Sequence, residues 1–226
     1  MKNIKFTIFF FLCALNAYSQ VPPGLFFVAG AEKGIWDSED LLADGGTGFV
    51  VGMGANWGYS ERCNFETNIL LKNSVLDFYY TDQAAVAVGK AKANAYSVGV
   101  SAQFNYYFIK PEEDKFYAGA LAGFGLFFTD GQYTVKNSNY EELYLPYRVD
   151  PTNLTRFEQF SFTPLAGIVT GYNDFRLSLK YNLGTTNLIK AFQTSQYDQN
   201  NNYTGPSLEG KLSSISLMLS YQFTHY

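Results

Sequence analysis

Residues Ser214–Phe223 read SISLMLSYQF, and this stretch decides the class of fold. Large apolar or aromatic side chains stand at Ile215, Leu217, Leu219, Tyr221 and Phe223, and mostly small or polar residues lie between them. A helix would instead bring apolar residues together three and four positions apart. Strict alternation indicates a β-strand with one apolar face, and ten residues are enough to cross a bilayer as a tilted strand.

Two further segments carry the same pattern: Phe175–Gly184 (FRLSLKYNLG) and Tyr96–Tyr106 (YSVGVSAQFNY). Weaker alternation predicts five more strands, near Leu25–Ile35, Thr47–Tyr59, Arg62–Leu71, Lys115–Phe128 and Phe157–Tyr172. Two of them are rich in glycine, at Gly48–Gly54 and Gly119–Gly125, where we expect the strands to bend; the pattern leaves open which of their faces points inward. Pro164 should interrupt pairing and mark a bulge or a strained position.

The connections between these strands alternate in length. The long ones are Trp36–Gly46, Lys72–Ala91, Thr129–Arg156 and Thr186–Gly210, and the short ones are Tyr59–Glu61, Lys110–Asp114 and Tyr172–Asp174. Outer-membrane barrels alternate long external loops with tight periplasmic turns. The sequence therefore predicts an all-β fold: a closed, antiparallel, up-and-down transmembrane β-barrel of about eight strands.

Aromatic residues gather at both ends of the predicted strands, as expected of the girdles at membrane interfaces. The band on the short-turn side comprises Phe26, Phe27, Trp57, Tyr59, Tyr106, Tyr107, Phe108, Phe116, Tyr117, Tyr172, Phe175, Tyr221 and Phe223. The band on the long-loop side comprises Trp36, Phe78, Tyr79, Tyr80, Phe127, Phe128 and Phe157.

The first residues predict export. Lys2 and Lys5 precede the apolar run Ile8–Leu15, and Ala17 and Ser19 supply small residues for cleavage after Ser19. The run is too short for a spanning helix. We therefore expect a signal peptide at residues 1–19 and an outer-membrane barrel domain at residues 20–226.

Charge and cysteine content narrow the possible partners. Cleavage would take two of the 16 basic residues and none of the 20 acidic ones, which moves the net charge from −4 to −6. This balance argues against a nucleic-acid partner. Cys63 would be the sole remaining cysteine, so no intramolecular disulfide is expected. The scarcity of histidine and cysteine, and the lack of a spaced acidic loop, predict neither a metal nor another cofactor.

Two segments resemble a known family. Ser97–Phe127, SVGVSAQFNYYFIKPEEDKFYAGALAGFGLF, looks like a hairpin of the small outer-membrane β-barrel proteins known as the porin family or outer membrane protein beta-barrel domain. The closing SLMLSYQFTHY resembles the C-terminal strand that the barrel-assembly machinery recognises, with Tyr221, Phe223 and Tyr226 as the signal. His225 departs from the usual ending. The resemblance implies the cell outer membrane and leaves the activity open.

Polar residues on the inward face form the first candidate site. Arg176 and Lys180 share the inward face of one strand, and Glu66 and Asn68 share that of another. An eight-stranded barrel is just filled by side chains, and buried charges must pair. We expect Glu66 to join Arg176 or Lys180 in a lumen network, with an ion path as the alternative.

The third long loop is the second candidate site. Tyr133, Tyr140, Tyr144 and Tyr147 punctuate Asp130–Thr155, and tyrosine makes adaptable contact surface at low entropic cost. This loop is either a recognition surface for an extracellular ligand or a hydrated cap over the barrel mouth.

Two rival functions stay open. A lipid-modifying enzyme would need a base beside its nucleophile, and the only histidine, His225, would lie across the membrane from lipid A. A soluble lipocalin-like binder of an apolar ligand would show the same alternation with its apolar face inward. We expect a non-enzymatic, monomeric outer-membrane barrel surrounded by lipid, with loops that serve surface interaction or envelope integrity.

Overall fold

The computed structural model describes residues 24–38, 43–81, 87–111, 115–134, 143–144, 148–149, 160–191 and 208–223. Every described helix or strand is a β-strand. Within these ranges no helix is long and apolar enough to cross a membrane. The expected signal peptide, residues 1–19, lies outside them.

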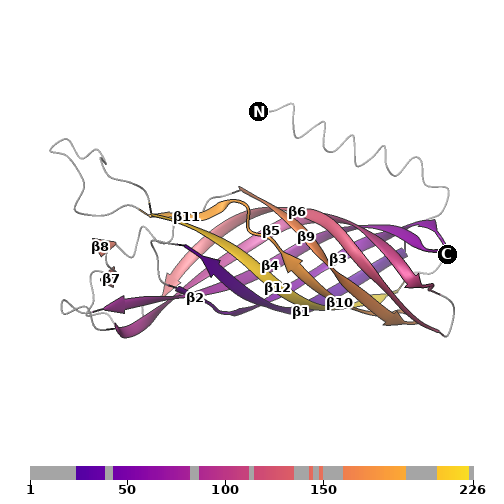
Figure 1. Cartoon of the computed structure of the whole chain (residues 1–226), viewed down its shortest axis with the longest axis horizontal. Coiled ribbons are helices and arrows are strands. Elements are labelled where there is room, and N and C mark those ends of the chain that lie inside the picture. The colour runs from indigo at the N-terminus through magenta and orange to yellow at the C-terminus, as the bar shows by residue number, and fades with distance from the viewer. Residues whose placement is uncertain are drawn as a thin grey trace, which may run out of the picture.

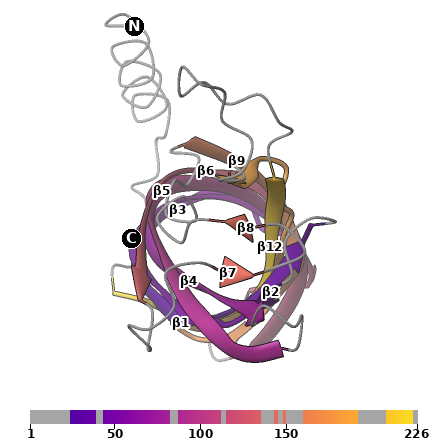
Figure 2. The ribbon, with the colours of Figure 1, turned by 90° about the vertical axis from the view of Figure 1, so that its left-hand side faces the viewer.

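Eight long strands form a closed barrel (Figures 1 and 2). They are β1 (Gly24–Asp37), β3 (Thr47–Ser60), β4 (Cys63–Thr81), β5 (Ala87–Ile109), β6 (Phe116–Thr134), β9 (Phe160–Tyr172), β10 (Phe175–Asn182) and β12 (Leu208–Gln222). Each pairs antiparallel with the next along the chain, and β12 pairs with β1. The predicted closed up-and-down barrel of eight strands is confirmed.

Four short strands lie toward the end of the barrel opposite the two-residue turns that join β3 to β4 and β9 to β10 (Figure 1). They are β2 (Ala43–Gly45), β7 (Leu143–Tyr144), β8 (Arg148–Val149) and β11 (Asn187–Ala191). β2 pairs with β4, β11 pairs with β12, and β7 pairs with both β4 and β8. Seen from this end, β7 and β8 lie across the barrel opening (Figure 2).

Tight turns close the opposite end. Two-residue turns, Glu61–Arg62 and Asn173–Asp174, join β3 to β4 and β9 to β10. Asn173 has a φ of 50°, a left-handed conformation that asparagine tolerates better than most residues. The Lys110 ammonium lies 2.5 Å from the Glu61 carboxylate and ties two of these connections together.

The strands on the long-loop side are longer than the sequence predicts. β4 and β5 stay paired up to Thr81 and Ala87, so the expected connection Lys72–Ala91 is wrong for most of its length. The segment looked like a loop because alanine, glycine and lysine replace large apolar residues in the first part of β5. Backbone hydrogen bonds continue the ladder regardless of those side chains.

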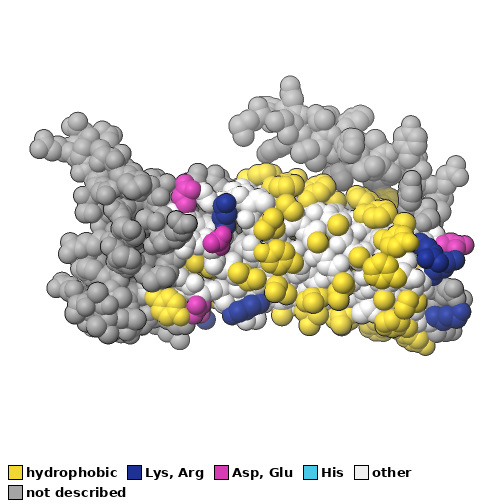
Figure 3. Space-filling view, in the orientation of Figure 1, with side chains coloured by type: hydrophobic (Ala, Val, Ile, Leu, Met, Phe, Trp, Pro, Cys, Tyr) yellow, Lys and Arg dark blue, Asp and Glu magenta, His cyan; other side chains and the backbone are white. Residues whose placement is uncertain are grey.

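The outward face of the barrel is apolar and the inward face is largely polar. Along β10 the exposed residues are Phe175, Leu177, Leu179 and Tyr181, and the buried ones are Arg176, Ser178, Lys180 and Asn182. On the face shown in Figure 3, apolar side chains are spread over the middle of the barrel, and charged ones stand toward its two ends. This polarity is the opposite of a lipocalin-like barrel, so that alternative is wrong.

Outward aromatics pair near the tight turns, where Phe27 stacks on Phe223 at 4.8 Å between ring centroids. Among the described side chains, the predicted girdles are wrong for six, which point into the barrel instead: Phe26, Trp36, Phe78, Tyr107, Tyr117 and Phe127. Neighbouring residues such as Phe26 and Phe27 face opposite sides of a strand, so only one of each pair can reach the outer surface.

Glycine makes room inside the barrel. A Cβ on Gly54 would lie 2.5 Å from both the Asn68 amide oxygen and the Phe26 ring, so only glycine lets these side chains fill the lumen there. The inward face of this strand also carries Val50, whereas Phe49 and Val51 point outward. The facing that the sequence left open is thereby settled for β3.

Pro164 does not produce the expected bulge between β6 and β9, since their register runs through it without a shift. Its carbonyl accepts a hydrogen bond from the Leu183 amide, on the side of β9 that faces β10. The nitrogen of Pro164, which has no hydrogen to donate, faces the same side. The β9–β10 ladder ends at Leu165, just before the proline. The missing N–H therefore falls at the end of the β9–β10 ladder.

Candidate functional site: the barrel lumen

A carboxylate from β4 lies at the centre of the lumen. Glu66 is 1% exposed and receives a hydrogen bond from the guanidinium of Arg176 on β10. From β5, Asn105 donates to the same carboxylate at 2.7 Å and Gln103 at 2.8 Å. Glu66 and Gln103 are direct cross-strand neighbours, so the register of β4 and β5 places them together.

Gln103 extends the network to a second cation. Its amide oxygen accepts a hydrogen bond from the Lys180 ammonium at 2.7 Å while its amide nitrogen donates to Glu66. Asn105 also donates to Asn64 at 2.5 Å, and Asn64 donates to the Tyr107 hydroxyl at 2.8 Å. We call this set the lower lumen network: Asn64, Glu66, Gln103, Asn105, Tyr107, Arg176 and Lys180.

The lower lumen network unites three of the four residues expected to face the lumen together. Glu66, Arg176 and Lys180 belong to it, whereas Asn68 donates to the Ser101 hydroxyl at 3.3 Å. The Arg176 guanidinium also lies 4.8 Å from the centroid of the Phe26 ring, a cation–π arrangement. A charge buried in the lumen without a partner is costly in free energy. The hydrogen bonds and the ion pair of this network therefore allow Arg176 and Lys180 to be buried.

A second ion pair lies nearer the long-loop end and was missed by the sequence reasoning. The Lys72 ammonium of β4 is 2.6 Å from the Glu32 carboxylate of β1. Ser74 and Ser216 donate to the same carboxylate at 2.7 and 3.1 Å. We call these four residues the upper lumen network. The sequence placed Lys72 in a loop, and the weak alternation around Glu32 did not mark it as inward.

Apolar clusters accompany the networks inside the barrel. One cluster contains Phe26, Val28, Val50, Leu70, Phe127 and Met218, and another contains Tyr107, Leu121, Leu165 and Val169, with Tyr117 packed against it. The Tyr117 ring lies over Gly171, where an added Cβ would come within 2.4 Å of it. The described lumen is thus filled by side chains, as expected at this strand number.

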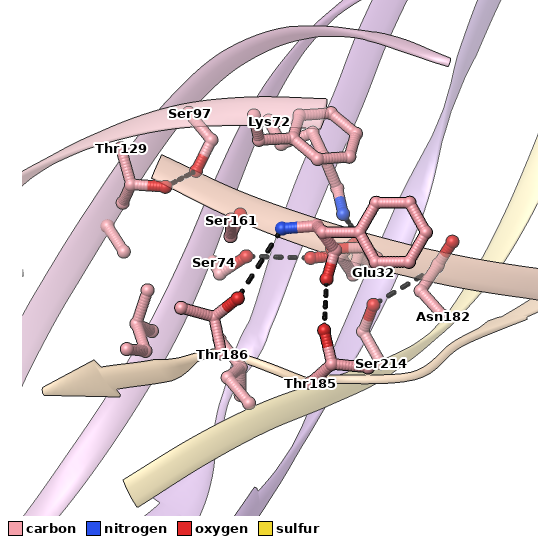
Figure 4. Close-up of a pocket in the computed structure, with 17 residues that line it drawn as sticks. Glu32, Lys72, Ser74, Ser97, Thr129, Ser161, Asn182, Thr185, Thr186 and Ser214 are labelled. Carbon is pink, nitrogen blue, oxygen red and sulfur yellow. Dashed lines mark hydrogen bonds and ion pairs between the residues drawn. The ribbon is translucent and has the colours of Figure 1, made fainter. Parts of the chain in front are cut away.

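One cavity of about 50 Å³ adjoins the upper lumen network (Figure 4). Hydroxyl groups dominate its polar walls, and Glu32 and Lys72 lie on one side. Since a water needs roughly 10–15 Å³ of such volume, the cavity has space for a few waters.

The other predicted residues lie at the two ends of the barrel. Tyr221 and Phe223 are exposed on the outward face, and the Phe223 amide donates to the Leu25 carbonyl at 3.0 Å. Tyr133 belongs to β6 and Tyr144 to β7, where it pairs with Thr81. Tyr140, Tyr147 and Tyr226 lie outside the described residues, as does His225.

No metal site or disulfide stands out in the described part of the chain. Among these residues, no group of three or more histidine, cysteine, aspartate or glutamate side chains could hold a metal ion. Cys63 is a free, partly exposed thiol at the start of β4.

No family model and no curated protein matches this chain. Solved structures do resemble it. The outer membrane protein OprG from Pseudomonas aeruginosa is 12% identical, with a TM-score of 0.48 over 90% of this chain and 98% of that one. Ail, the attachment invasion locus protein of Yersinia pestis, is 9% identical, with a TM-score of 0.44 over 90% and 100%. The outer membrane enzyme PagL is 10% identical, with a TM-score of 0.42 over 88% and 99%.

Identities this low carry no function from one protein to another, and the closed ladder of hydrogen-bonded strands establishes the fold by itself. The solved structures that resemble this chain are small bacterial outer-membrane β-barrel proteins.

Proposed function

We propose that this chain is a non-enzymatic barrel of the bacterial outer membrane, with a filled lumen and external loops that serve surface interaction or envelope integrity. One observation carries the proposal: the apolar side chains of the strands point outward, and the ion pairs point inward. A continuous apolar surface of this extent on a soluble monomer would be unusual and aggregation-prone. Surrounding lipid removes that difficulty.

The dimensions of the apolar surface support the same conclusion. From Tyr96 to Phe108 the outward row of β5 rises about 30 Å along the barrel axis, at about 3.3 Å per residue and a strand tilt of about 40°. The apolar band of outer-membrane barrels is about 25 Å tall. On β12, Leu217 and Leu219 would contact acyl chains, and on the same face Lys211 would lie above them in the headgroup region.

Export and assembly follow from this placement. Residues 1–19 would act as a cleaved signal peptide, and Tyr221, Phe223 and Tyr226 would present the final strand to the barrel-assembly machinery. The stack of Phe223 on Phe27 supports a role for this end in closing the barrel, because it joins the last strand to the first.

The filled lumen favours a scaffold over a pore. Among the described residues, the two buried carboxylates, Glu32 and Glu66, are already paired with cations, and the cavity is only about 50 Å³. The loops beyond the barrel are therefore the working surface of the proposal, with the segment Asp130–Thr155 and its tyrosines as the candidate contact for an extracellular ligand.

Fractionation followed by gel electrophoresis of boiled and unboiled samples tests the placement. We expect an outer-membrane band that resists detergent and migrates differently after boiling. A soluble periplasmic band whose migration is unaffected by heat contradicts the proposal.

Two strains then test the role. Lipid A from a strain that lacks the gene should be unchanged, and a changed acyl pattern would support an enzyme instead. Deletion of Asp130–Thr155 should reduce binding to surfaces or partners, and unchanged binding would identify that loop as a cap.

A further inference from the structure

The barrel wall has a seam next to the lumen cavity. β9 pairs with β6 along its whole length, but with β10 only from Leu165 to Tyr172. Beyond Asn182 the chain leaves β10, passes through Gly184–Thr186 and continues as β11, which pairs with β12. Among the described residues, Phe160–Pro164 of β9 therefore have no strand ladder on this side.

Threonine hydroxyls close this seam in place of a ladder. Thr185 donates its hydroxyl to the Phe162 carbonyl at 2.5 Å, and the Phe162 amide donates to the Thr186 hydroxyl at 3.4 Å. Both bonds are drawn in Figure 4 at the edge of the cavity. Together with the bond from the Leu183 amide to the Pro164 carbonyl, these two side-chain bonds, one of them long, hold this part of the wall less firmly than a continuous ladder does.

The cavity lies directly behind the seam. Ser161 and Thr163 of β9 and the segment Gly184–Thr186 line one part of it, and the Glu32–Lys72 ion pair lines another (Figure 4). The lining residues Glu32, Thr129 and Ser214 are all more than nine-tenths buried. The site is thus built into the barrel, and it reaches the barrel wall at the seam.

The chemistry of the lining selects a class of ligand. Hydroxyls both donate and accept hydrogen bonds. The Lys72 ammonium carries three protons, and among the described residues it pairs with the Glu32 carboxylate and lies over the Phe127 ring. Because that pair is already neutral, a charged ligand would bring an uncompensated charge into the lumen. Leu188 and Leu212 add apolar surface for C–H groups. These features together fit a neutral molecule that carries several hydroxyls.

We propose that this cavity binds a small neutral polyol group, about the size of glycerol, and that Thr185 and Thr186 form the movable part of the wall that admits it. The cavity, which has space for a few waters, is about large enough for a three-carbon polyol. Phe160, Phe162 and Leu183 are exposed on the outer surface around the seam. A free polyol and the glycerol headgroup of a neutral lipid would therefore present the same chemistry.

Methyl NMR of the protein in detergent micelles tests the proposal. Free glycerol is titrated in one arm, and monoacylglycerol in the micelle is titrated in the other. We expect saturable shifts of the Leu188 and Leu212 methyl groups, with the Leu121 and Val169 methyls, which lie nearer the tight turns, unchanged. Saturation by glycerol identifies the free polyol as ligand, and saturation only by monoacylglycerol identifies the headgroup.

Two variants at one position provide the control. Ser161→Leu fills the cavity and should weaken binding at least about tenfold, whereas Ser161→Ala keeps the space and should change it less than about threefold. Both variants should keep the heat-modifiable band of a folded barrel. The proposal is overturned if the chemical shifts never saturate in either arm, or if they persist equally in Ser161→Leu. Either result would mean that the cavity holds water only. The membrane placement is unaffected by that result, because the gel reports on it separately.

Discussion

Glu66→Gln probes the buried charge network with almost no change in side-chain size. The substitution removes the carboxylate that accepts hydrogen bonds from Arg176, Gln103 and Asn105, and leaves the guanidinium buried without its counter-charge. Breaking one partner of a buried ion pair costs roughly 3–5 kcal/mol. We therefore expect the free energy of unfolding to fall by about 4 kcal/mol, which is about three decades in the folding equilibrium constant.

The assay is urea unfolding of the protein in phospholipid vesicles, followed by tryptophan fluorescence and measured in both directions. Glu61→Gln is the matched control, because Glu61 pairs with Lys110 at the surface, with side-chain exposures of 81% and 36%. Exposed pairs contribute roughly 0.2–1 kcal/mol, so this variant should stay close to the parent. A second control, Glu66→Gln combined with Arg176→Met, removes the orphaned cation and should recover most of the loss.

The reasoning is refuted if Glu66→Gln costs no more than Glu61→Gln. It is also refuted if adding Arg176→Met to Glu66→Gln lowers the free energy of unfolding by as much as Arg176→Met does alone. The two residues would then contribute independently.

Three further changes test other parts of the structure. Gly54→Ala places a Cβ against Asn68 and Phe26 and should lower the unfolding free energy by roughly 1–3 kcal/mol, whereas Gly58→Ala, with open space around it, should not; equal urea midpoints would contradict the packing. Asn173→Val puts a β-branched residue into a left-handed turn and should cost about 1–2 kcal/mol, with Asn173→Gly tolerated; tolerance of valine would exclude that turn conformation. Thr186→Val removes the acceptor of the Phe162 amide and should speed its hydrogen exchange, and an unchanged rate would mean that the seam is held by other contacts.

The architecture could be predicted from the sequence because it depends on a strict period. Every second residue of Phe175–Asn182 is large and apolar, and the same two-residue period fixes which side chains face the lumen. Glu66 and Arg176 could be assigned to the inside for that reason alone. Their contact follows from the closure of the barrel, which brings β4 and β10 to face each other across a narrow interior.

The upper part of the barrel was harder to predict, because its strands do not alternate large and polar residues. Lys72 lies where β4 leaves the apolar band, and Glu32 lies in a segment of alanine and glycine, so neither residue carries a periodic signal. The aromatic side chains were misassigned where two are adjacent, as in Phe26–Phe27 and Tyr106–Tyr107. Composition places such pairs at an interface, and only the register decides which ring faces lipid and which fills the lumen.

The most direct test of the membrane account compares two spin labels on one face of β12. Leu217→Cys and Lys211→Cys are made in a chain with Cys13 and Cys63 replaced by serine, and collision rates with oxygen and with a water-soluble nickel chelate are measured in vesicles. The account predicts an oxygen-accessible, nickel-inaccessible label at Leu217 and a nickel-accessible label at Lys211. Free collision of the nickel chelate with the Leu217 label would contradict it, because that residue would then face water.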